Sequence, residues 1–400
     1  MTGTSEYRYL FADLLTNQVY AELPLFGVSF NRELNTAGSF NGQMLLSDSR
    51  ASAYNVVAST IPARTAVYVE RNNVLVWGGI LWSRSYDSTG QTMSLTATEF
   101  ESYFTHRRIV RDYDFIDVDQ LTACQQILNN LQALPNGNIG VIVGTETSNV
   151  LITKSIYDYE LKPCLEFIYE MSRGSIGFDF NIDVAYGLNN VITKTLRMEY
   201  PRRGRAYSPS DPTSTMLEFP ANVISYSYPE DGSKTTNTLY GVGGGQGENA
   251  LISIQQDAGQ LSTGWALLEN SVSYTDYDDP ALLAGITQGN LLSLLNPVVV
   301  TTVTFPTETL DPLFGTYNTG DDVRLRITDD RFPNTLDVIR RISSIALIVG
   351  DNGADLVTLS LVETPTIFAP QSGGEFGAVS SLSITPTVGG RYPVGVYLND

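Results

Sequence analysis

The stretch that decides the fold is AVYVERNNVLVWGGILWSRSYDSTGQTMSLTA, residues 66–97. Apolar and polar residues alternate through much of it, which is typical of strands in a sheet with one buried face. A polar turn at Arg71-Asn72-Asn73 and a hairpin at Asp87-Ser88-Thr89-Gly90 divide it into three segments. Asn, Asp and Gly supply the positive φ that tight turns require. The sequence therefore predicts three consecutive antiparallel strands here.

A second stretch of the same kind lies late in the chain. Its strand-like segments are residues 321–327, 336–347 and 356–361. A turn at Asp329-Asp330-Arg331 follows the first segment, and a hairpin at Asp351-Asn352-Gly353 follows the second. Because the three-strand pattern occurs twice, we predict two small β-barrels related by pseudo-duplication.

The 400 residues are too many for one ordinary core, so several domains are expected. The predicted fold class is β-rich α+β multidomain, with an α+β module and a helix-containing insertion between the barrels. The predicted segments are a first β-barrel at 1–105, the α+β module and a linker at 106–215, the first part of the second barrel at 216–247, the insertion at 248–296, the remainder of the second barrel at 297–369, and a Gly/Ser/Pro-rich extension at 370–400.

Helical spacing of apolar residues is confined to a few segments. The predicted helices are residues 98–104, 117–131, 161–172 and 278–297. Asp117 or Asp119 lies near the start of the second, Pro163 falls in the first turn of the third, and an Asp followed by Pro280 begins the fourth. Acidic residues and Pro are favoured in these N-terminal positions.

Composition limits the chemistry. The net charge of -19 repels nucleic acid on average, and the simplest interpretation is solubility. Cys124 and Cys164 lie in apolar helical patterns and are predicted to be buried free thiols, as in a protein made in a reducing cytoplasm. The single histidine, His106, excludes a multi-histidine metal site and is expected at the surface or in a linker. We predict no metal and no cofactor.

The glycine-rich run at 241–247 is not a phosphate-binding loop, because no GK[ST] follows it and its spacing fails the dinucleotide pattern. No apolar run reaches about 18 residues, so no membrane-spanning helix is predicted. The first residues have no basic or apolar region typical of a signal peptide.

Five residues are candidates for subunit contacts. Trp77 and Trp82 lie five positions apart in one strand, so without a bulge they face opposite sides. One is expected in the core and the other at an interface, where tryptophan is enriched. Arg202, Arg203 and Arg205 cluster in the Pro-, Arg- and Ser-rich segment 201–215. They bind an acidic partner or a phosphate, or they only solvate a loop.

In the order of these elements the sequence resembles the hub proteins of phage tail tips and baseplates, in particular the minor tail proteins of long-tailed phages. The residues that carry the resemblance are Val76-Trp77-Gly78-Gly79-Ile80-Leu81-Trp82, Tyr86 and Leu95 in the first half, and residues 236–243, Asp279-Pro280 with the following helix, and residues 319–325 in the second. The resemblance extends over about residues 5–365 and excludes the segment after Pro370.

The resemblance implies a homotrimer in which two barrels per chain alternate around a three-fold axis. Such a pseudo-hexameric ring joins a six-fold tail tube to three-fold tip components around the DNA passage. The implied partners are a distal tail or tail-tube protein, a tape measure protein, and tail spike or fibre proteins, and the genomic DNA passes through without specific binding. The implied location is the virion tail tip, after synthesis in the host cytoplasm, with a structural role in DNA ejection and host cell entry and no enzymatic activity.

Two alternatives stay open. A receptor- or carbohydrate-binding tail protein is consistent with the tyrosines, tryptophans and Gly-rich loops. A cell-wall hydrolase is consistent with the abundance of Asp and Glu, since paired carboxylates suffice for glycoside cleavage. The sequence does not show which carboxylates would pair, and no segment reads as a separate catalytic domain.

Overall fold

The computed structural model describes residues 5–173, 176–245, 247–275, 279–296, 298–308, 313–350 and 354–363. The chain divides into two compact units, Met1–Pro365 and Thr366–Asp400, and all described residues lie in the first. The predicted extension at 370–400 and the predicted hairpin at 351–353 lie outside the described residues. Within the described part, no helix is long and apolar enough to span a bilayer.

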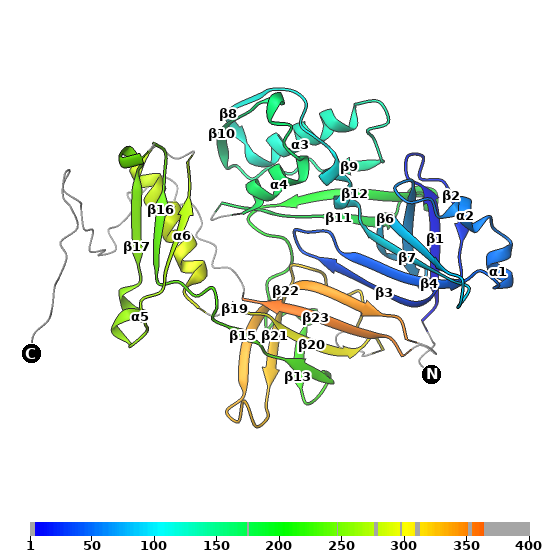
Figure 1. Ribbon diagram of the computed structural model, residues 1–400. Coiled ribbons are helices and arrows are strands. Elements are labelled where there is room, and N and C mark those ends of the chain that lie inside the picture. The colour runs from blue at the N-terminus through cyan, green and yellow to red at the C-terminus, as the bar shows by residue number, and fades with distance from the viewer. Residues whose placement is uncertain are drawn as a thin grey trace, which may run out of the picture. The chain divides into compact units, whose positions relative to one another are not determined.

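The first part of the chain is built of strands with a few short helices (Figure 1). The elements are β1 (Tyr7–Asp13), β2 (Val19–Glu22), β3 (Phe26–Glu33), β4 (Ser39–Leu45), α1 (Ser49–Ser52), α2 (Val56–Ser59), β5 (Thr65–Arg71), β6 (Val74–Asp87), β7 (Thr92–Glu99) and the 3-10 helix η1 (Phe100–His106). The three strands predicted from residues 66–97 are β5, β6 and β7. Asn72 and Asn73 both have positive φ in the turn between β5 and β6, as predicted.

The middle part contains the predicted α+β elements. They are β8 (Tyr113–Asp119), α3 (Gln120–Gln132), β9 (Val141–Val143), β10 (Leu151–Ile156), η2 (Asp158–Glu160), α4 (Cys164–Ser172), β11 (Asp179–Tyr186), η3 (Leu188–Asn190) and β12 (Ile192–Glu199). Asp119 caps α3 by accepting the backbone N–H groups of Leu121 and Thr122, which otherwise lack partners in a first turn. Pro163 is the residue immediately before α4.

The last part holds the second set of strands. Its elements are β13 (Met216–Phe219), β14 (Ser225–Ser227), β15 (Glu230–Asp231), β16 (Thr238–Val242), η4 (Gly247–Asn249), β17 (Ile252–Gln256), α5 (Ala258–Ser262), β18 (Glu269–Ser273), α6 (Pro280–Leu294), β19 (Val298–Val299), β20 (Thr301–Pro306), β21 (Asp322–Ile327), β22 (Leu336–Ile348) and β23 (Leu356–Val362). The second predicted three-strand stretch is β21, β22 and β23.

One large sheet runs through both halves of the chain. Its strand order is β14-β20-β23-β22-β3-β4-β7-β6-β5-β1-β2, and β21 and β13 continue it beside β22. The two halves join where β22 pairs antiparallel with β3, from Ser344 opposite Glu33 to Ile348 opposite Ser29. Figure 1 shows β22 beside β3 at this joint.

This sheet corrects the expectation of two separate barrels. Among the described residues, no strand pairing closes either half, and the β3–β22 pair makes the halves one sheet. The repeated sequence pattern predicts the strands correctly. The alternation of apolar and polar residues along a strand does not show which other strand pairs with its free edge.

The insertion is larger than predicted. Strand β16 pairs with β17 and β18 in a separate sheet, and α6 packs on β16 and β17. Residues 238–242 therefore belong with the insertion and not with the second barrel, to which the 216–247 boundary assigned them.

Two hydrophobic clusters lie on opposite faces of the first-half strands. One contains Leu10, Tyr68 and Ile80 together with Ile127 of α3 and Phe167 of α4. The other is shared by the two halves and joins Phe11, Phe40 and Trp77 to residues of the second half. Those residues include Phe305, Leu325, Ile342 and Leu359. Burial of this apolar surface is the main force that holds the halves together.

Candidate functional site: a charged junction between the halves

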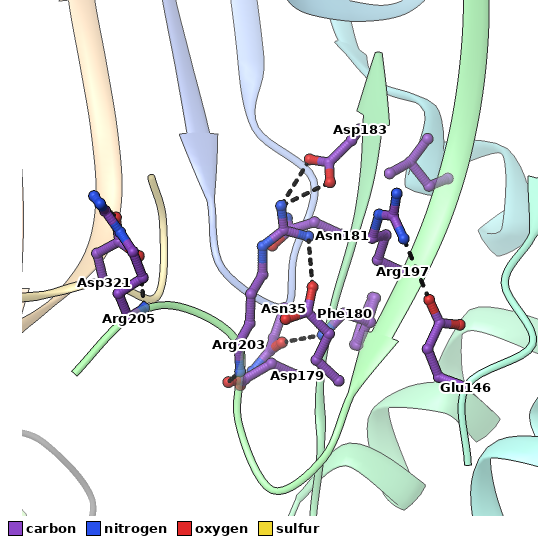
Figure 2. Close-up of polar contacts among 12 residues, drawn as sticks. Asn35, Glu146, Asp179, Phe180, Asn181, Asp183, Arg197, Arg203, Arg205 and Asp321 are labelled. Atoms are coloured by element: carbon purple, nitrogen blue, oxygen red, sulfur yellow. Dashed lines mark hydrogen bonds and ion pairs between the residues drawn. The ribbon is translucent and has the colours of Figure 1, made fainter. Parts of the chain in front are cut away.

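A cluster of buried charges links β11, the segment after β12, and β22. Asp179 begins β11, and its carboxylate accepts hydrogen bonds from the Arg341 guanidinium, the backbone N–H of Arg203 at 2.7 Å and the Asn35 side-chain amide at 2.7 Å. Asp179 and Arg341 are each 5% exposed. Figure 2 shows Asn35, Asp179 and Arg203 close together at the start of β11.

Backbone geometry brings these groups together. Asn35 has φ 62°, a left-handed conformation that Asn tolerates, and it exchanges hydrogen bonds with Phe180 of β11. Gly204 and Gly320 also have positive φ, and a Cβ on Gly204 would lie 2.1 Å from the carbonyl carbon of Gly320. Only glycine permits this close approach of the two backbones.

The arginine cluster predicted from the sequence lies at this junction. Arg202 binds Asp322 through two hydrogen bonds of 2.8 and 2.6 Å. Arg205 donates its backbone N–H to Asp321 at 2.8 Å, and its guanidinium lies 3.2 Å from the same carboxylate. Bidentate arginine–carboxylate pairs fix geometry as well as charge.

Arg203 makes the third connection, to Asp183 of β11, with distances of 2.9 and 2.7 Å. Asp183 also accepts from Arg32 of β3 at 2.8 Å. Burial disfavours the Asp183 carboxylate, but Arg32 and Arg203 outweigh that effect and hold the pKa of Asp183 below its usual range. All three arginines of segment 201–215 therefore pair with carboxylates of their own chain.

Two buried glutamates complete the junction. Glu99 accepts the Gly38 backbone N–H at 2.7 Å and the Arg32 Nε at 3.3 Å, and Glu101 accepts the Ile182 backbone N–H. Burial raises the pKa of both carboxyls, and the two share the nearby cation Arg32 with Asp183. The second oxygen of Glu101 is buried without a hydrogen-bond partner. Burial thus shifts both carboxyls toward their protonated forms.

The contacts of the junction hold separate segments of the chain together. Its cations are bound by carboxylates of the same chain, and the Asp179–Arg341 pair is sealed from solvent. In the described part of the chain, no three His, Cys, Asp or Glu side chains gather as metal ligands would. Breaking a buried pair of this kind leaves a charge without compensation.

The two tryptophans occupy different environments. Trp77 is fully buried in the shared core, 5.3 Å from the Phe40 ring, and its indole N–H donates to the Asn31 carbonyl. Trp82 is partly buried against the other cluster, donates to Ser102 at 2.9 Å and lies against His106, with ring centroids 4.7 Å apart and the rings tilted by 30°. Trp77 and Trp82 thus pack against different clusters, as expected for opposite faces, although a bulge interrupts β6 at Trp82. A subunit contact through Trp82 stays a prediction.

The other singled-out residues lie where the sequence predicts. Cys124 and Cys164 are buried free thiols, and His106 is exposed. The sequence reasoning missed Asp179, Asp183, Arg341, Glu99 and Glu101. A signal was available for Asp179 and Asp183, because each has an apolar residue on both sides in the sequence, where a charged residue in a buried strand needs a partner.

Comparison with known proteins identifies the fold. No protein-family model matches the chain, and no curated sequence matches it. A tail protein from Neisseria meningitidis MC58 has a TM-score of 0.58 at 14% identity, covering 89% of this chain and 96% of that one. The 43 kDa tail protein of prophage MuSo2 from Shewanella oneidensis has a TM-score of 0.55 at 11% identity, covering 90% and 98%.

A third solved structure agrees. Prophage tail protein gp18 from Listeria monocytogenes EGD-e has a TM-score of 0.52 at 13% identity, covering 88% of this chain and 94% of that one. The chain thus has the fold of these phage tail proteins, and the likeness covers most of this chain and nearly all of each of theirs. The resemblance inferred from the sequence is confirmed at the level of the fold.

Proposed function

We propose that this protein is a structural hub of a phage tail tip. In this proposal three copies form a pseudo-hexameric ring that joins the six-fold tail tube to three-fold tip components around the DNA passage. The shared fold with phage tail proteins supports a structural tail role. The observation that supports the proposed ring is a strand order that occurs twice within the chain.

The first half has the strand order β3-β4-β7-β6-β5-β1, and the second half has β14-β20-β23-β22-β21-β13. The chain order agrees as well. Along the chain, β1, β3, β4, β5, β6 and β7 correspond one to one to β13, β14, β20, β21, β22 and β23. The pairs agree in direction, except that β1 and β5 are antiparallel whereas β13 and β21 are parallel. The short β3–β4 connection corresponds to the position of the insertion between β14 and β20.

Two local details repeat as well. A bulge interrupts the middle strand of each set, between Leu81 and Ser83 in β6 and between Ile342 and Ser344 in β22. The carbonyl before each bulge accepts a hydrogen bond from a backbone N–H that lies outside the strands. The donor is the second residue before the start of the preceding strand, β5 in the first half and β21 in the second. Ala63 donates to Leu81 at 2.7 Å, and Gly320 donates to Ile342 at 2.8 Å. Ala63 and Gly320 both have positive φ.

A duplicated unit is what a trimer requires to imitate six-fold symmetry, because three chains then present six similar walls. The net charge of -19 suits a passage that DNA crosses without adhering. The partners that this role requires are a tail-tube or distal tail protein, a tape measure protein and spike or fibre proteins. The proposed role is non-enzymatic, and the proposed location is the tail tip.

Electron microscopy of the purified full-length chain, alone and with its tail-tube protein, tests this function. The expected images are rings with three-fold symmetry, six similar walls and an open centre. Isolated single chains under both conditions would overturn the proposal. Cleavage of peptidoglycan or binding to a glycan array by the purified chain would instead support one of the two alternatives.

A further inference from the structure

The strand edge that joins the two halves inside one chain has an unpaired counterpart. After its bulge, β22 has β23 on one edge and β3 on the other. After its bulge, β6 has β7 on one edge, while its pairing with β5 ends at Ile80. Among the described residues, no strand pairs with Ser83–Asp87 of β6 on the β5 side.

The complementary edge is also free. β3 lies between β4 and β22, whereas its counterpart β14 pairs with β20 and ends the sheet in the described part of the chain. The segment 225–231 keeps one antiparallel register with residues 298–304 through β14 and β15, from Ser225 opposite Thr304 to Asp231 opposite Val298. The segment 225–231 thus has an unpaired edge at least as long as the part of β3 that pairs with β22. Unpaired edges are templates for pairing with another chain.

We propose that Ser83–Asp87 of β6 in one copy pairs antiparallel with residues 227–231 of a second copy of this chain. The inference rests on the proposed function and specifies the contact between its subunits. Each half then offers its edge strand to the middle strand of the next half. Within a chain the contact is β3 to β22, and between chains it is residues 227–231, from the end of β14 through β15, to β6. Such head-to-tail contacts generate a ring when the rotation closes.

The register follows from the observed strand pairs, counted outward from each bulge. In the second half, Ser344 lies opposite Ser360, Ser360 opposite Thr302, and Thr302 opposite Ser227. In the first half the equivalent positions are Ser83, Thr96, Asn41 and Ser29.

Ser29 lies opposite Ile348, four residues after Ser344. By the same offset, Ser227 lies opposite Asp87, four residues after Ser83, in the neighbouring copy. Tyr228 then faces Tyr86, and Pro229 faces Ser85. Tyr86 is 53% exposed, and Ser85, Ser227 and Pro229 are exposed, so this side of the chain is open to a partner.

Cysteine cross-linking of the full-length chain tests the register. The matched pairs are Ser85→Cys with Pro229→Cys and Tyr86→Cys with Tyr228→Cys. The mismatched pairs are Ser85→Cys with Tyr228→Cys and Tyr86→Cys with Pro229→Cys. A shift of one residue places the side chains on opposite faces of the sheet, so the mismatched pairs are controls of equal chemistry. The native Cys124 and Cys164 are buried, which limits their background reaction.

Under mild oxidation, we expect both matched pairs to give dimers and trimers on non-reducing gels, at least tenfold more than the mismatched pairs. Mixing two single-cysteine variants, Ser85→Cys and Pro229→Cys, is expected to give dimers only, because each molecule then carries one of the two thiols. The Tyr228 ring packs on Phe332, with ring centroids 5.2 Å apart, and its loss can disturb folding. In that case the Ser85/Pro229 pair tests the register by itself.

Light scattering on the same samples separates this inference from the proposed function. A trimer whose matched pairs fail to cross-link would overturn the strand pairing and leave the ring intact. A trimer in which matched and mismatched pairs cross-link equally would also overturn it. A chain that stays monomeric at every concentration would overturn both proposals.

Discussion

The guanidinium of Arg341, in the middle of β22, donates to the carboxylate of Asp179 at the start of β11, a partner 162 residues away in the sequence. Arg341 also donates to the carbonyl oxygens of Gly320 at 3.1 Å and Arg203 at 2.7 Å. One buried side chain thus links the α+β module, the segment after β12 and the second set of strands. This geometry makes the junction a structural connection with measurable effects on stability.

Asp179→Asn is expected to lower the free energy of unfolding by about 3–5 kcal/mol, because it leaves the buried Arg341 cation uncompensated. Chemical denaturation followed by circular dichroism measures this. The matched control is Asp337→Asn, which weakens the part-exposed pairs with Arg324 at 2.7 Å and Arg326 at 3.5 Å and is expected to cost about 1 kcal/mol or less. Equal effects of the two substitutions would contradict the structural role of the junction.

Asp321→Ala is expected to destabilise the connection that precedes β21. The Asp321 carboxylate accepts the backbone N–H groups of Arg205 at 2.8 Å and Asn318 at 3.0 Å, and the substitution leaves both donors without this partner. The expected loss is about 1–3 kcal/mol, measured by thermal unfolding. Asp330→Ala, at an exposed turn position, is the control and is expected to change stability by less than about 0.5 kcal/mol.

The buried glutamates predict an unusual pH dependence. Because burial raises the pKa of Glu99 and Glu101 in the folded chain, the folded state binds more protons than the unfolded state above pH 4.5, the ordinary value for these groups. Their contribution to stability is therefore fully present below that pH and is lost as pH rises through the raised pKa values.

Glu101→Gln tests this. The amide keeps an oxygen that accepts the Ile182 N–H and removes the charge, so the melting temperature at pH 8 is expected to rise and its decline between pH 5 and pH 8 to flatten. The exposed Glu160→Gln is the control and is expected to change neither. A lower melting temperature for Glu101→Gln at pH 8 would show that the carboxyl is ionised and stabilising.

Lys194 of β12 is a buried cation whose ammonium nitrogen has no hydrogen-bond partner, although it lies 4.8 Å from the centre of the Phe100 ring. Burial lowers the pKa of Lys194 to about 8, so its ionisation opposes folding below that pH, and this cost fades as pH rises toward 10.5. Lys194→Met is expected to stabilise the chain by about 1–2 kcal/mol at pH 7, since the thioether fills the same space without charge.

Urea denaturation at pH 7 measures that gain. Lys234→Met, at an exposed position, is the control and is expected to be neutral within about 0.5 kcal/mol. Destabilisation by Lys194→Met would mean that the ammonium has a stabilising partner.

Local sequence patterns predicted the elements well and their assembly poorly. Alternation and turn chemistry identified β5 to β7 and β21 to β23, because these signals act between neighbours in the chain. The sequence offered Asp117 or Asp119 for the start of the second helix. Asp119 caps α3, whereas residues 117–119, predicted as helix, belong to β8. The β3–β22 joint depends on contact between segments more than 300 residues apart, which no local period encodes. The three arginines of segment 201–215 were noticed, but their carboxylate partners lie in β11, β21 and the turn before it.

The most direct test of the central claim is the absolute mass of the full-length chain, measured by size-exclusion chromatography with multi-angle light scattering over a range of concentrations. We predict a species of three 43.8 kDa chains that grows with concentration or on addition of the tail-tube protein. A mass of one chain under all of these conditions would contradict it.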